Sequence, residues 1–305
     1  GIVGAGNVGA TVAYTLSIGS QVSEITLVDK NPQKAQGEIL DLRHGLPFIP
    51  YVSLQHGGLK DLEGADVIVL TAGIPRKPGE TRLDLAKKNT NLMAELIPDI
   101  SRLNKKAIYL VVSNPVDVLT YAAIKHSSLD SNQVFGSGNI LDSARLRSML
   151  GEHFKVDPAN VHAYVLGEHG DSSFPVYSQA FIGCTPLNRL EGYDEDELTD
   201  IYTQVREVAA KVIKMKGATY YAVSLGVSKI INAIDLDQNR VMPVSTLLED
   251  YHGYSDVCMS VPAIVNRKGI DRVLKIPFSG QEKELFKQSY SKINDALIQT
   301  KLKTV

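Results

Sequence analysis

The chain has 305 residues, of which 44% are hydrophobic and 22% are charged, and its formal net charge is −2. This balance gives no reason to expect a nucleic acid or an anionic membrane as a partner, and the longest apolar runs are far shorter than the roughly 20 residues of a membrane-spanning helix. Cys184 and Cys258 lie far apart in the sequence, without the spacing of metal ligands. We therefore expect a cytoplasmic protein with reduced thiols and no metal site.

The first half of the chain alternates short β-branched runs with helical patterns. Strands are expected at residues 1–4, 24–29, 52–56, 66–72, 107–113 and 133–138. Because these runs are apolar throughout, the strands should be buried on both faces of a parallel sheet. Six such strands joined by helical crossovers predict a doubly wound, Rossmann-type α/β domain over residues 1–140. The first strand starts the chain without a methionine, so we expect a few residues to precede Gly1.

The second half of the chain has a different pattern. A long helical stretch is expected from about Asp196 to Ile234, with a break near Gly217. Strand candidates follow at 241–248, 256–265 and 271–277, and a final helix is expected from about Gln281 to Lys303. This order predicts a mixed α+β domain over residues 141–305, which we expect to hold the substrate, with some interleaving near the boundary.

A glycine-rich turn follows the first strand. Gly4, Gly6 and Gly9 have the spacing G-x-G-x-x-G, and the second strand ends in Asp29, 20 residues after Gly9. In this context the glycines permit a tight turn and close approach of a pyrophosphate, and the following helix offers free N–H groups to the phosphates. Asp29 would accept hydrogen bonds from a ribose diol and repel a 2′-phosphate, which favours NAD over NADP. A purely structural glycine turn is the alternative.

His169 lies between Gly167 and Gly170 in a loop after an apolar run. An enzyme that takes hydride from an alcohol needs a group for the hydroxyl proton, and imidazole suits this task because its pKa is about 6.5. A carboxylate should fix its tautomer and stabilise the protonated ring. Spacing alone does not name that carboxylate. Asp142 is one candidate, with Arg145 three residues later on the same helical face, although a helix N-cap and a solvated charge would also explain these two residues.

Five motifs occur in the order and at the spacing of a known family. They are "GAGNVG", "AGIPRKPGETRLDL", "VVSNPVDVLTY", "LDSARLR" and "GEHGDSSFPV", and together they extend over essentially the whole chain. On these motifs the chain resembles the lactate/malate dehydrogenase family, and most closely its bacterial L-lactate dehydrogenases. The resemblance implies an NAD-dependent dehydrogenase of small L-2-hydroxy acids that works as a homo-oligomer, either a dimer or a tetramer.

The resemblance also implies roles for the polar residues of these motifs. His169 would be the proton acceptor and donor, with Asp142 as its partner. Arg145 would anchor the substrate carboxylate, because a planar guanidinium matches a carboxylate with two parallel hydrogen bonds. Arg82 would polarise the substrate carbonyl.

Further residues are implied around the cofactor. Asn114 would hold the nicotinamide or the substrate oxygen, and its bond to Pro115 is expected to be cis. The expected cofactor contacts are Gly4, Gly6, Asn7, Val8, Gly9, Asp29, Thr71, Ala72, Gly73, Asn89, Asn114 and Ser137.

The segment "TAGIPRKPGETRLDL", residues 71–85, carries Arg76 and Arg82 six residues apart, together with two prolines and Gly79. We expect this segment to be a lid loop that brings Arg82 to the substrate, because a cation delivered by a closing loop stabilises the developing alkoxide and excludes water. In the family, the position of Arg76 faces the variable end of the substrate. Glutamine is usual there in lactate dehydrogenases and arginine in malate dehydrogenases, because the second carboxylate of oxaloacetate needs a cation.

Two other positions favour pyruvate as the substrate. Glu80 stands where malate dehydrogenases more often have methionine, and Thr219 stands where lactate dehydrogenases place threonine against the substrate methyl group. We therefore expect an L-lactate dehydrogenase, with an L-malate dehydrogenase as the alternative that Arg76 supports and a dual-substrate enzyme between them. A non-catalytic NAD-binding protein is a third hypothesis. It predicts a missing histidine, loop arginine or carboxylate anchor, and the sequence has all three.

Arg147 and His162 match the positions that bind fructose 1,6-bisphosphate between subunits in allosteric bacterial lactate dehydrogenases. Two basic side chains suit a bisphosphate, so the resemblance implies this molecule as an effector. The alternative is an ordinary surface arginine and a buried strand histidine.

Overall fold

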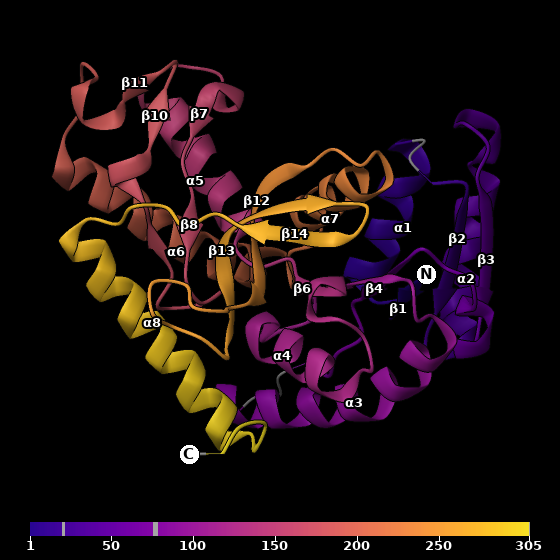
Figure 1. The fold of residues 1–305 in the computed structure, drawn as a ribbon. Helices are drawn as coiled ribbons and strands as arrows, with labels where there is room; N and C mark the ends of the chain where they lie inside the picture. Colours follow the sequence, from indigo (N-terminus) through magenta and orange to yellow (C-terminus); the bar gives the residue numbers. More distant parts are fainter. Residues whose placement is uncertain (20–21, 76–78, 305) are drawn as a thin grey trace.

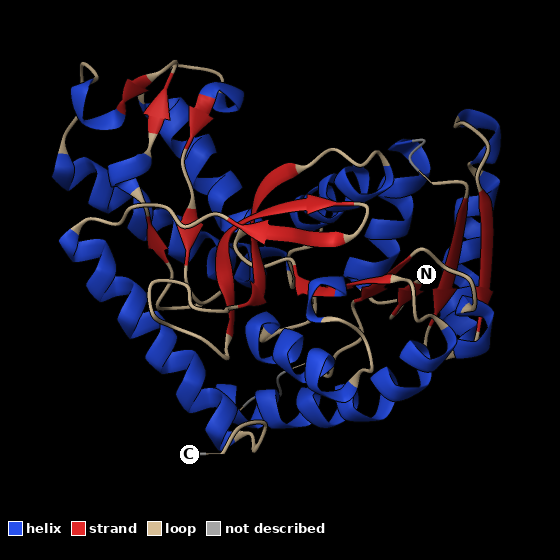
Figure 2. Ribbon diagram, viewed as in Figure 1, coloured by secondary structure: helices blue, strands red, loops and turns tan. Residues whose placement is uncertain are grey.

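The computed structural model describes residues 1–19, 22–75 and 79–304, and within them one nine-stranded sheet forms the centre of the molecule (Figures 1 and 2). Its strands are β1 Ile2–Val3, β2 Glu24–Val28, β3 Ser53–Gly57, β4 Val67–Leu70, β5 Ile108–Val111, β6 Val134–Gly136, β12 Arg240–Leu247, β13 Cys258–Asn266 and β14 Gly269–Val273. The order across the sheet is β14-β13-β12-β6-β5-β4-β1-β2-β3. Strands β1 to β6 are parallel, so the predicted doubly wound sheet is confirmed.

The inner parallel strands are buried on both faces, because successive apolar side chains point to opposite sides of the sheet. The expectation is wrong for β3, which lies at the edge of the sheet and exposes His56. On β1, Ile2 belongs to one core cluster and Val3 to another, and Leu110 and Val111 of β5 divide in the same way. The helices that contribute to the first cluster are α1 Asn7–Gly19, α2 Pro32–His44 and α7 Tyr221–Asp235. Those that contribute to the second are α3 Arg82–Leu103, α4 Val116–His126 and α8 Gly280–Gln299. The helices therefore form a layer on each face (Figure 1).

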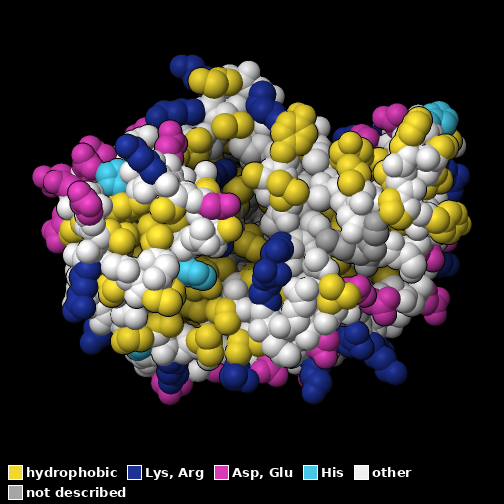
Figure 3. All heavy atoms as spheres, turned by 90° about the horizontal axis from the view of Figure 1, so that it is seen from above, with side chains coloured by type: hydrophobic (Ala, Val, Ile, Leu, Met, Phe, Trp, Pro, Cys, Tyr) yellow, Lys and Arg dark blue, Asp and Glu magenta, His cyan; other side chains and the backbone are white. Residues whose placement is uncertain are grey.

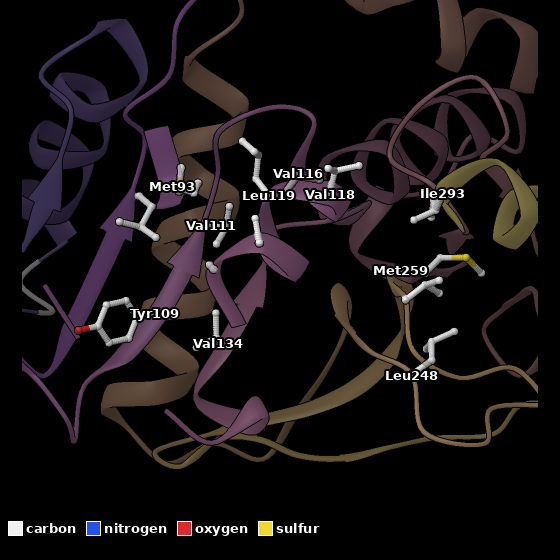
Figure 4. Packing of buried hydrophobic residues seen from close by; sticks show 14 of the residues in the cluster. Met93, Tyr109, Val111, Val116, Val118, Leu119, Val134, Leu248, Met259 and Ile293 are labelled. Carbon is white, nitrogen blue, oxygen red and sulfur yellow. The ribbon is translucent and has the colours of Figure 1, made fainter. Parts of the chain in front are cut away.

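The core is continuous between the two halves of the chain. Val111 of β5 and Leu119 of α4 belong to the same cluster of buried side chains as Met259 of β13 and Ile293 of α8 (Figure 4). Strands β12 to β14 extend the central sheet in an antiparallel sense, and Ser245 of β12 pairs with Gly136 of β6. The second half therefore contributes three strands to the sheet of the first, which goes further than the interleaving near the boundary that the sequence predicts.

The rest of the second half surrounds a smaller core. It contains α5 Ile140–His153 and α6 Glu195–Lys216, with the short strands β7 Val161–His162, β8 Val165–Leu166, β9 Phe174–Pro175, β10 Phe181–Ile182 and β11 Thr185–Pro186. The predicted break near Gly217 is confirmed: this residue ends α6 with φ of 88°, a left-handed conformation that glycine adopts without strain. Short 3-10 helices lie at Leu46–Phe48, Leu59–Leu62, Ser131–Gln133, Pro158–Asn160, Tyr177–Gln179 and Leu187–Arg189.

The surface seen from above mixes acidic, basic and hydrophobic side chains, and it is hollowed near its middle, with Lys and Arg side chains beside the hollow (Figure 3). Within the described residues, no helix combines the length and the apolar character needed to cross a bilayer. In the same part of the chain, His, Cys, Asp and Glu side chains do not gather in a group of three or more that could hold a metal ion.

Candidate active site

The glycine-rich turn has the shape of a pyrophosphate cradle. Gly4, which follows β1, has φ of 112°, and a Cβ there would lie 2.6 Å from the backbone nitrogen of Ala72. A Cβ on Gly9 would lie 1.9 Å from the carbonyl oxygen of Gly4, so α1 packs directly on the turn. A Cβ on Gly6 would meet nothing within 4 Å, which leaves open space before the N-terminus of α1 at Asn7. These residues therefore fit a dinucleotide, with its phosphates at the helix N-terminus.

Asp29 lies beside this turn. One carboxylate oxygen accepts a hydrogen bond from the backbone N–H of Ala5 at 2.7 Å, and the other accepts one from the N–H of Asn31 at 2.9 Å. Both donors belong to the backbone, so they fix the direction of the carboxylate and leave lone pairs free for another donor. This arrangement is compatible with the predicted bond to a ribose hydroxyl.

Replacing Gly9 with alanine should abolish tight NADH binding, because the new methyl group would overlap the carbonyl of Gly4 and push α1 away from the phosphates. We expect Kd for NADH, measured by fluorescence titration, to rise by roughly 100-fold or more, the equivalent of one or two lost charge-assisted hydrogen bonds. Gly37→Ala is the matched control, because its Cβ would meet nothing within 4 Å and α2 should gain a few tenths of a kcal/mol to about 1 kcal/mol. Equal NADH affinity in both variants would contradict the predicted cradle.

Of the remaining predicted cofactor residues, Val8 lies half-buried on α1. The others lie at or beside the carboxyl ends of β4, β5 and β6, the edge where open α/β sheets bind ligands. Thr71 donates its hydroxyl to the carbonyl of Gly4 at 2.9 Å, which ties this edge to the turn. Asn89 of α3 accepts from the N–H of Ile74 at 2.7 Å and donates to the carbonyl of Asn114 at 2.8 Å. The predicted cis bond between Asn114 and Pro115 is present. The other members of this group are Ala72, Gly73 and the buried Ser137.

The structure brings together two of the predicted catalytic residues, His169 and Asp142, and the predicted substrate anchor, Arg145. Nδ1 of His169 lies 2.7 Å from Oδ2 of Asp142, and Oδ1 of the same carboxylate accepts from Nη1 of Arg145 at 2.9 Å. Asp142 and Arg145 are three residues apart on α5, and their side chains are 14% and 16% exposed, whereas that of His169 is 26% exposed. The carboxylate is therefore shared by a base and a guanidinium, and the imidazole keeps access to solvent.

These contacts shift the pKa values of the pair. Burial of His169 disfavours the charged ring, but the charge and hydrogen bond of Asp142 outweigh burial and raise the pKa of His169 above its ordinary value. Burial of Asp142 opposes its ionisation, but His169 and Arg145 outweigh this effect and lower the pKa of its carboxyl group. At neutral pH the group is therefore an ionised carboxylate beside an imidazole that is easily protonated, as proton transfer requires.

Two further residues hold the His169 loop and were missed by the sequence analysis. Asn139, fully buried, has Oδ1 3.3 Å from Nδ1 of His169 and donates Nδ2 to the carbonyl of Gly167 at 3.2 Å. Asp117, also buried, accepts the backbone N–H of His169 at 2.7 Å. A weak signal exists for Asp117: it is the one charged residue in the run "PVDVLTY" directly after Asn114.

Arg82 differs from its predicted setting in a loop. It is the first residue of α3, because the preceding residue, Thr81, is the N-cap and forms a capping box with Asp84. Its guanidinium makes two contacts with Asp171, at 2.7 and 2.9 Å, and both side chains are more than half exposed. Asp171 is two residues from His169 in the same loop. Arg82 therefore lies beside the candidate site with its charge occupied by a carboxylate. Arg76 falls outside the described residues.

The other predicted substrate and effector residues lie further along the chain. Thr219 is half-buried in the turn between α6 and α7. Arg147 of α5 donates to the carbonyls of Pro158 and Ala159 at 3.1 and 3.3 Å, just before β7. His162 of β7 is exposed, unlike the buried strand histidine considered as the alternative, and its ring stacks on Phe181 at 4.8 Å.

The turn, the carboxyl edge of the sheet and the histidine–carboxylate pair define a class of enzyme, an NAD-dependent dehydrogenase of small L-2-hydroxy acids. Residues 1–136 match the NAD binding domain of lactate/malate dehydrogenase, and residues 140–303 match the alpha/beta C-terminal domain of lactate/malate dehydrogenase. The chain belongs to the lactate/malate dehydrogenase family, as its motifs predict.

Individual relatives extend over almost the full length of the chain. It is 45% identical over 301 residues to an L-lactate dehydrogenase of Acetivibrio thermocellus, covering 97% of this chain and 95% of the relative. Over 293 residues it is 43% identical to an L-lactate dehydrogenase of Gloeobacter violaceus, covering 94% and 89%. The crystal structure of the minor L-lactate dehydrogenase of Enterococcus mundtii in a ligands-bound form has a TM-score of 0.94 at 36% identity, with 97% and 96% covered.

Proposed function

We propose that the protein catalyses the reduction of pyruvate to L-lactate with NADH, and the reverse reaction. The arrangement of His169, Asp142 and Arg145 carries this proposal, because it supplies both a proton donor and a carboxylate anchor. The names of the relatives, L-lactate dehydrogenases at 41–45% identity, support pyruvate as the substrate. Thr219, at a position where lactate dehydrogenases have threonine, supports it as well.

NAD, when bound in the cradle, supplies or accepts the hydride. For reduction, protonated His169 would give its Nε2 proton to the carbonyl oxygen of the substrate, because Nδ1 is engaged by Asp142. Asp142 would keep the ring oriented and stabilise the imidazolium before transfer. Arg145 would hold the substrate carboxylate with the N–H groups that Asp142 does not occupy. Asn114 would orient the carbonyl or the nicotinamide from the end of β5.

To polarise the substrate carbonyl, Arg82 must exchange its ion pair with Asp171 for a contact with the substrate. Its ion pair with Asp171 is exposed, and exposed pairs contribute only about 0–1 kcal/mol. A substrate carbonyl that gains negative charge in a closed, dry site would bind the guanidinium more strongly than a solvated carboxylate does. We propose that Arg82 leaves Asp171 when the substrate binds.

L-malate dehydrogenase remains the second candidate function, on the evidence of Arg76 alone. The experiment that separates the two is kcat/KM for pyruvate and for oxaloacetate, each with NADH. A preference for pyruvate supports the proposal. A preference for oxaloacetate by orders of magnitude would replace it with the malate function.

Arg76→Gln should raise the preference for pyruvate over oxaloacetate by roughly 10- to 100-fold, because one or two hydrogen bonds from a cation to the second carboxylate would be lost. The ratio of the two kcat/KM values measures this change. Arg102→Gln, at the far end of α3 and exposed, is the control and should leave the ratio unaltered. An unchanged ratio in Arg76→Gln would mean that Arg76 does not face the substrate.

We also propose fructose 1,6-bisphosphate as an effector that binds near Arg147 and His162. Cations gather there: burial, with the neighbouring charges of Arg240 and Arg147, lowers the pKa of Lys229. Cations that lie close together favour an anionic ligand. The bisphosphate should raise kcat/KM for pyruvate in the natural chain but not in an Arg147→Gln, His162→Gln double variant. Equal response of the two proteins, or none in either, would remove this site from the proposal.

Exposed apolar side chains on neighbouring helices support a homo-oligomer, a dimer or a tetramer. Tyr14 and Ile18 of α1 are 55% and 47% exposed, and Tyr221 and Leu225 of α7, which packs against α1, are 65% and 64% exposed. Light scattering on the purified protein tests the oligomeric state.

We further propose residues 1–140 as the NAD-binding unit and residues 141–305 as the substrate unit. We also propose a cytoplasmic location, in keeping with free Cys184 and Cys258.

A further inference from the structure

A lysine of the C-terminal helix lies between two carboxylates of the His169 loop. Nζ of Lys292 on α8 is 3.0 Å from Oε2 of Glu168, the residue before the histidine. The same Nζ is 3.8 Å from Oδ2 of Asp171, two residues after the histidine. Lys292 therefore contacts both carboxylates and lies closer to Glu168.

Of the two carboxylates, Glu168 is the more firmly held. Its backbone N–H donates to the hydroxyl of Ser289 at 2.6 Å, and its Oε2 accepts the N–H and the hydroxyl of Ser172 at 3.2 and 2.5 Å. Ser289 and Lys292 are three residues apart, so one face of α8 holds both the backbone and the side chain of Glu168. The side chain of Glu168 is 20% exposed and that of Asp171 is 58% exposed. Asp171 is therefore the carboxylate that is free to change partners.

Asp171 has two cations as neighbours. Nη1 of Arg82 lies 2.7 Å from Oδ2 of Asp171, the oxygen that also faces Lys292, and Nη2 lies 2.9 Å from Oδ1. Helix α8 also contacts α3, whose first residue is Arg82 (Figure 1). The charges thus alternate in the order Arg82, Asp171, Lys292 and Glu168, and they sum to zero.

Departure of Arg82 would disturb this balance. Asp171 would lose its nearest cation, and its carboxylate would face that of Glu168 with a repulsion of the order of 1 kcal/mol at surface separations. Lys292 is placed to offset this, because its ammonium group is a point charge on a flexible stem that can turn from one carboxylate towards the other. Before departure, the same ammonium group weakens the hold of Asp171 on Arg82, since two cations share one carboxylate oxygen.

We propose that Lys292 is a positioning residue that acts on Arg82 through Asp171: it competes with Arg82 for the carboxylate and remains as its partner when Arg82 turns to the substrate carbonyl. The inference rests on the proposed role of Arg82 in the reduction of the keto acid. The side chain of Lys292 is 43% exposed, so its effect should have the size of an exposed ion pair, roughly 2- to 5-fold in an equilibrium or a rate.

Lys292→Met removes the charge and keeps an unbranched apolar stem. Asp171 should then hold Arg82 more firmly, so kcat/KM for pyruvate should fall by roughly 2- to 5-fold while Kd for NADH is unchanged. Lys292→Arg restores the charge and should restore kcat/KM. Lys275→Met is the matched control, because Lys275 is 54% exposed and pairs with Asp250 at 3.3 Å. An unchanged kcat/KM in Lys292→Met overturns the inference.

Asp171→Asn separates this mechanism from a direct effect of the lysine charge, since a cation near the site also attracts an anionic substrate. In the Asp171→Asn chain Arg82 has lost this carboxylate partner. Adding Lys292→Met should then change kcat/KM by less than about 1.5-fold, because the two substitutions act on one interaction and are not additive. The same loss with and without Asp171→Asn would mean that Lys292 acts on the substrate directly, and it would overturn the inference.

The hold on Arg82 can also be measured without a substrate. Butanedione modifies free guanidinium groups, and peptide mass spectrometry gives the rate at Arg82. This rate should be lower in Lys292→Met, higher in Asp171→Asn and unaltered in Lys275→Met. A chain that reduces neither keto acid but shows these rates would refute the proposed function and keep the inference. Equal rates at Arg82 in Lys292→Met and in a natural chain that reduces pyruvate would keep the function and overturn the inference.

Discussion

Replacing His169 with glutamine should lower kcat/KM for pyruvate by roughly 10²- to 10⁴-fold, the range that a positioned general acid contributes. Glutamine is close in size and can hydrogen-bond to Asp142, but it cannot give a proton at neutral pH. The ring lies in a loop and is 26% exposed, so the substitution should cost little stability. Steady-state kinetics across pH should also show that the remaining activity no longer follows an ionisation near neutrality.

NADH binding shows whether His169→Gln has lost only proton transfer or whether its active site is disrupted. The cradle at Gly4, Gly6 and Gly9 lies on other elements than the His169 loop, so Kd for NADH should remain within about two-fold of the natural chain. His56→Gln, at an exposed position of β3, should have normal kinetics. If His169→Gln keeps kcat/KM within ten-fold of the natural chain, His169 is not the general acid, and a different group must supply the proton.

Much of the fold can be predicted because local patterns determine it. Runs such as "ADVIVL" must be buried on both sides, which leaves a parallel sheet with helices on both faces as the arrangement. The glycine spacing, the break at Gly217 and the pairing of Asp142 with Arg145 are equally local. Each depends on residues within a few positions of one another, where backbone geometry alone sets what can meet.

The parts that could not be predicted depend on contacts between distant segments. Asp171 pairs with Arg82 from 89 positions away, and Asp117 reaches His169 from 52. Sequence spacing holds no information on such distances once several crossovers intervene. The same holds for the three antiparallel strands that join the sheet of the first half, since their apolar runs could equally form a sheet of their own.

Asp142→Asn should reduce kcat/KM for pyruvate by roughly 10²- to 10⁴-fold at neutral pH, for two reasons that act on the same ring. The amide can present N–H to Nδ1, which favours the wrong tautomer. It also removes the charge that raises the pKa of His169. Reduction, which needs the protonated ring, should therefore decline from a lower pH than in the natural chain, and lactate oxidation, which needs the neutral ring, should reach its plateau at a lower pH.

The size of the pKa shift shows which of the two carboxylates, Asp142 or Asp117, acts more strongly on His169. Asp142 touches the ring directly at 2.7 Å, whereas Asp117 reaches only the backbone, so the pKa of His169 should fall further in Asp142→Asn than in Asp117→Asn. Asp99→Asn is the control for the charge change, because Asp99 and Arg102 form an ion pair with the same spacing on an exposed part of α3. Equal pH profiles for Asp142→Asn and the natural chain would mean that Asp142 acts through orientation alone. The charge that favours the imidazolium would then have to come from Asp117, the remaining buried carboxylate whose charge acts on the ring.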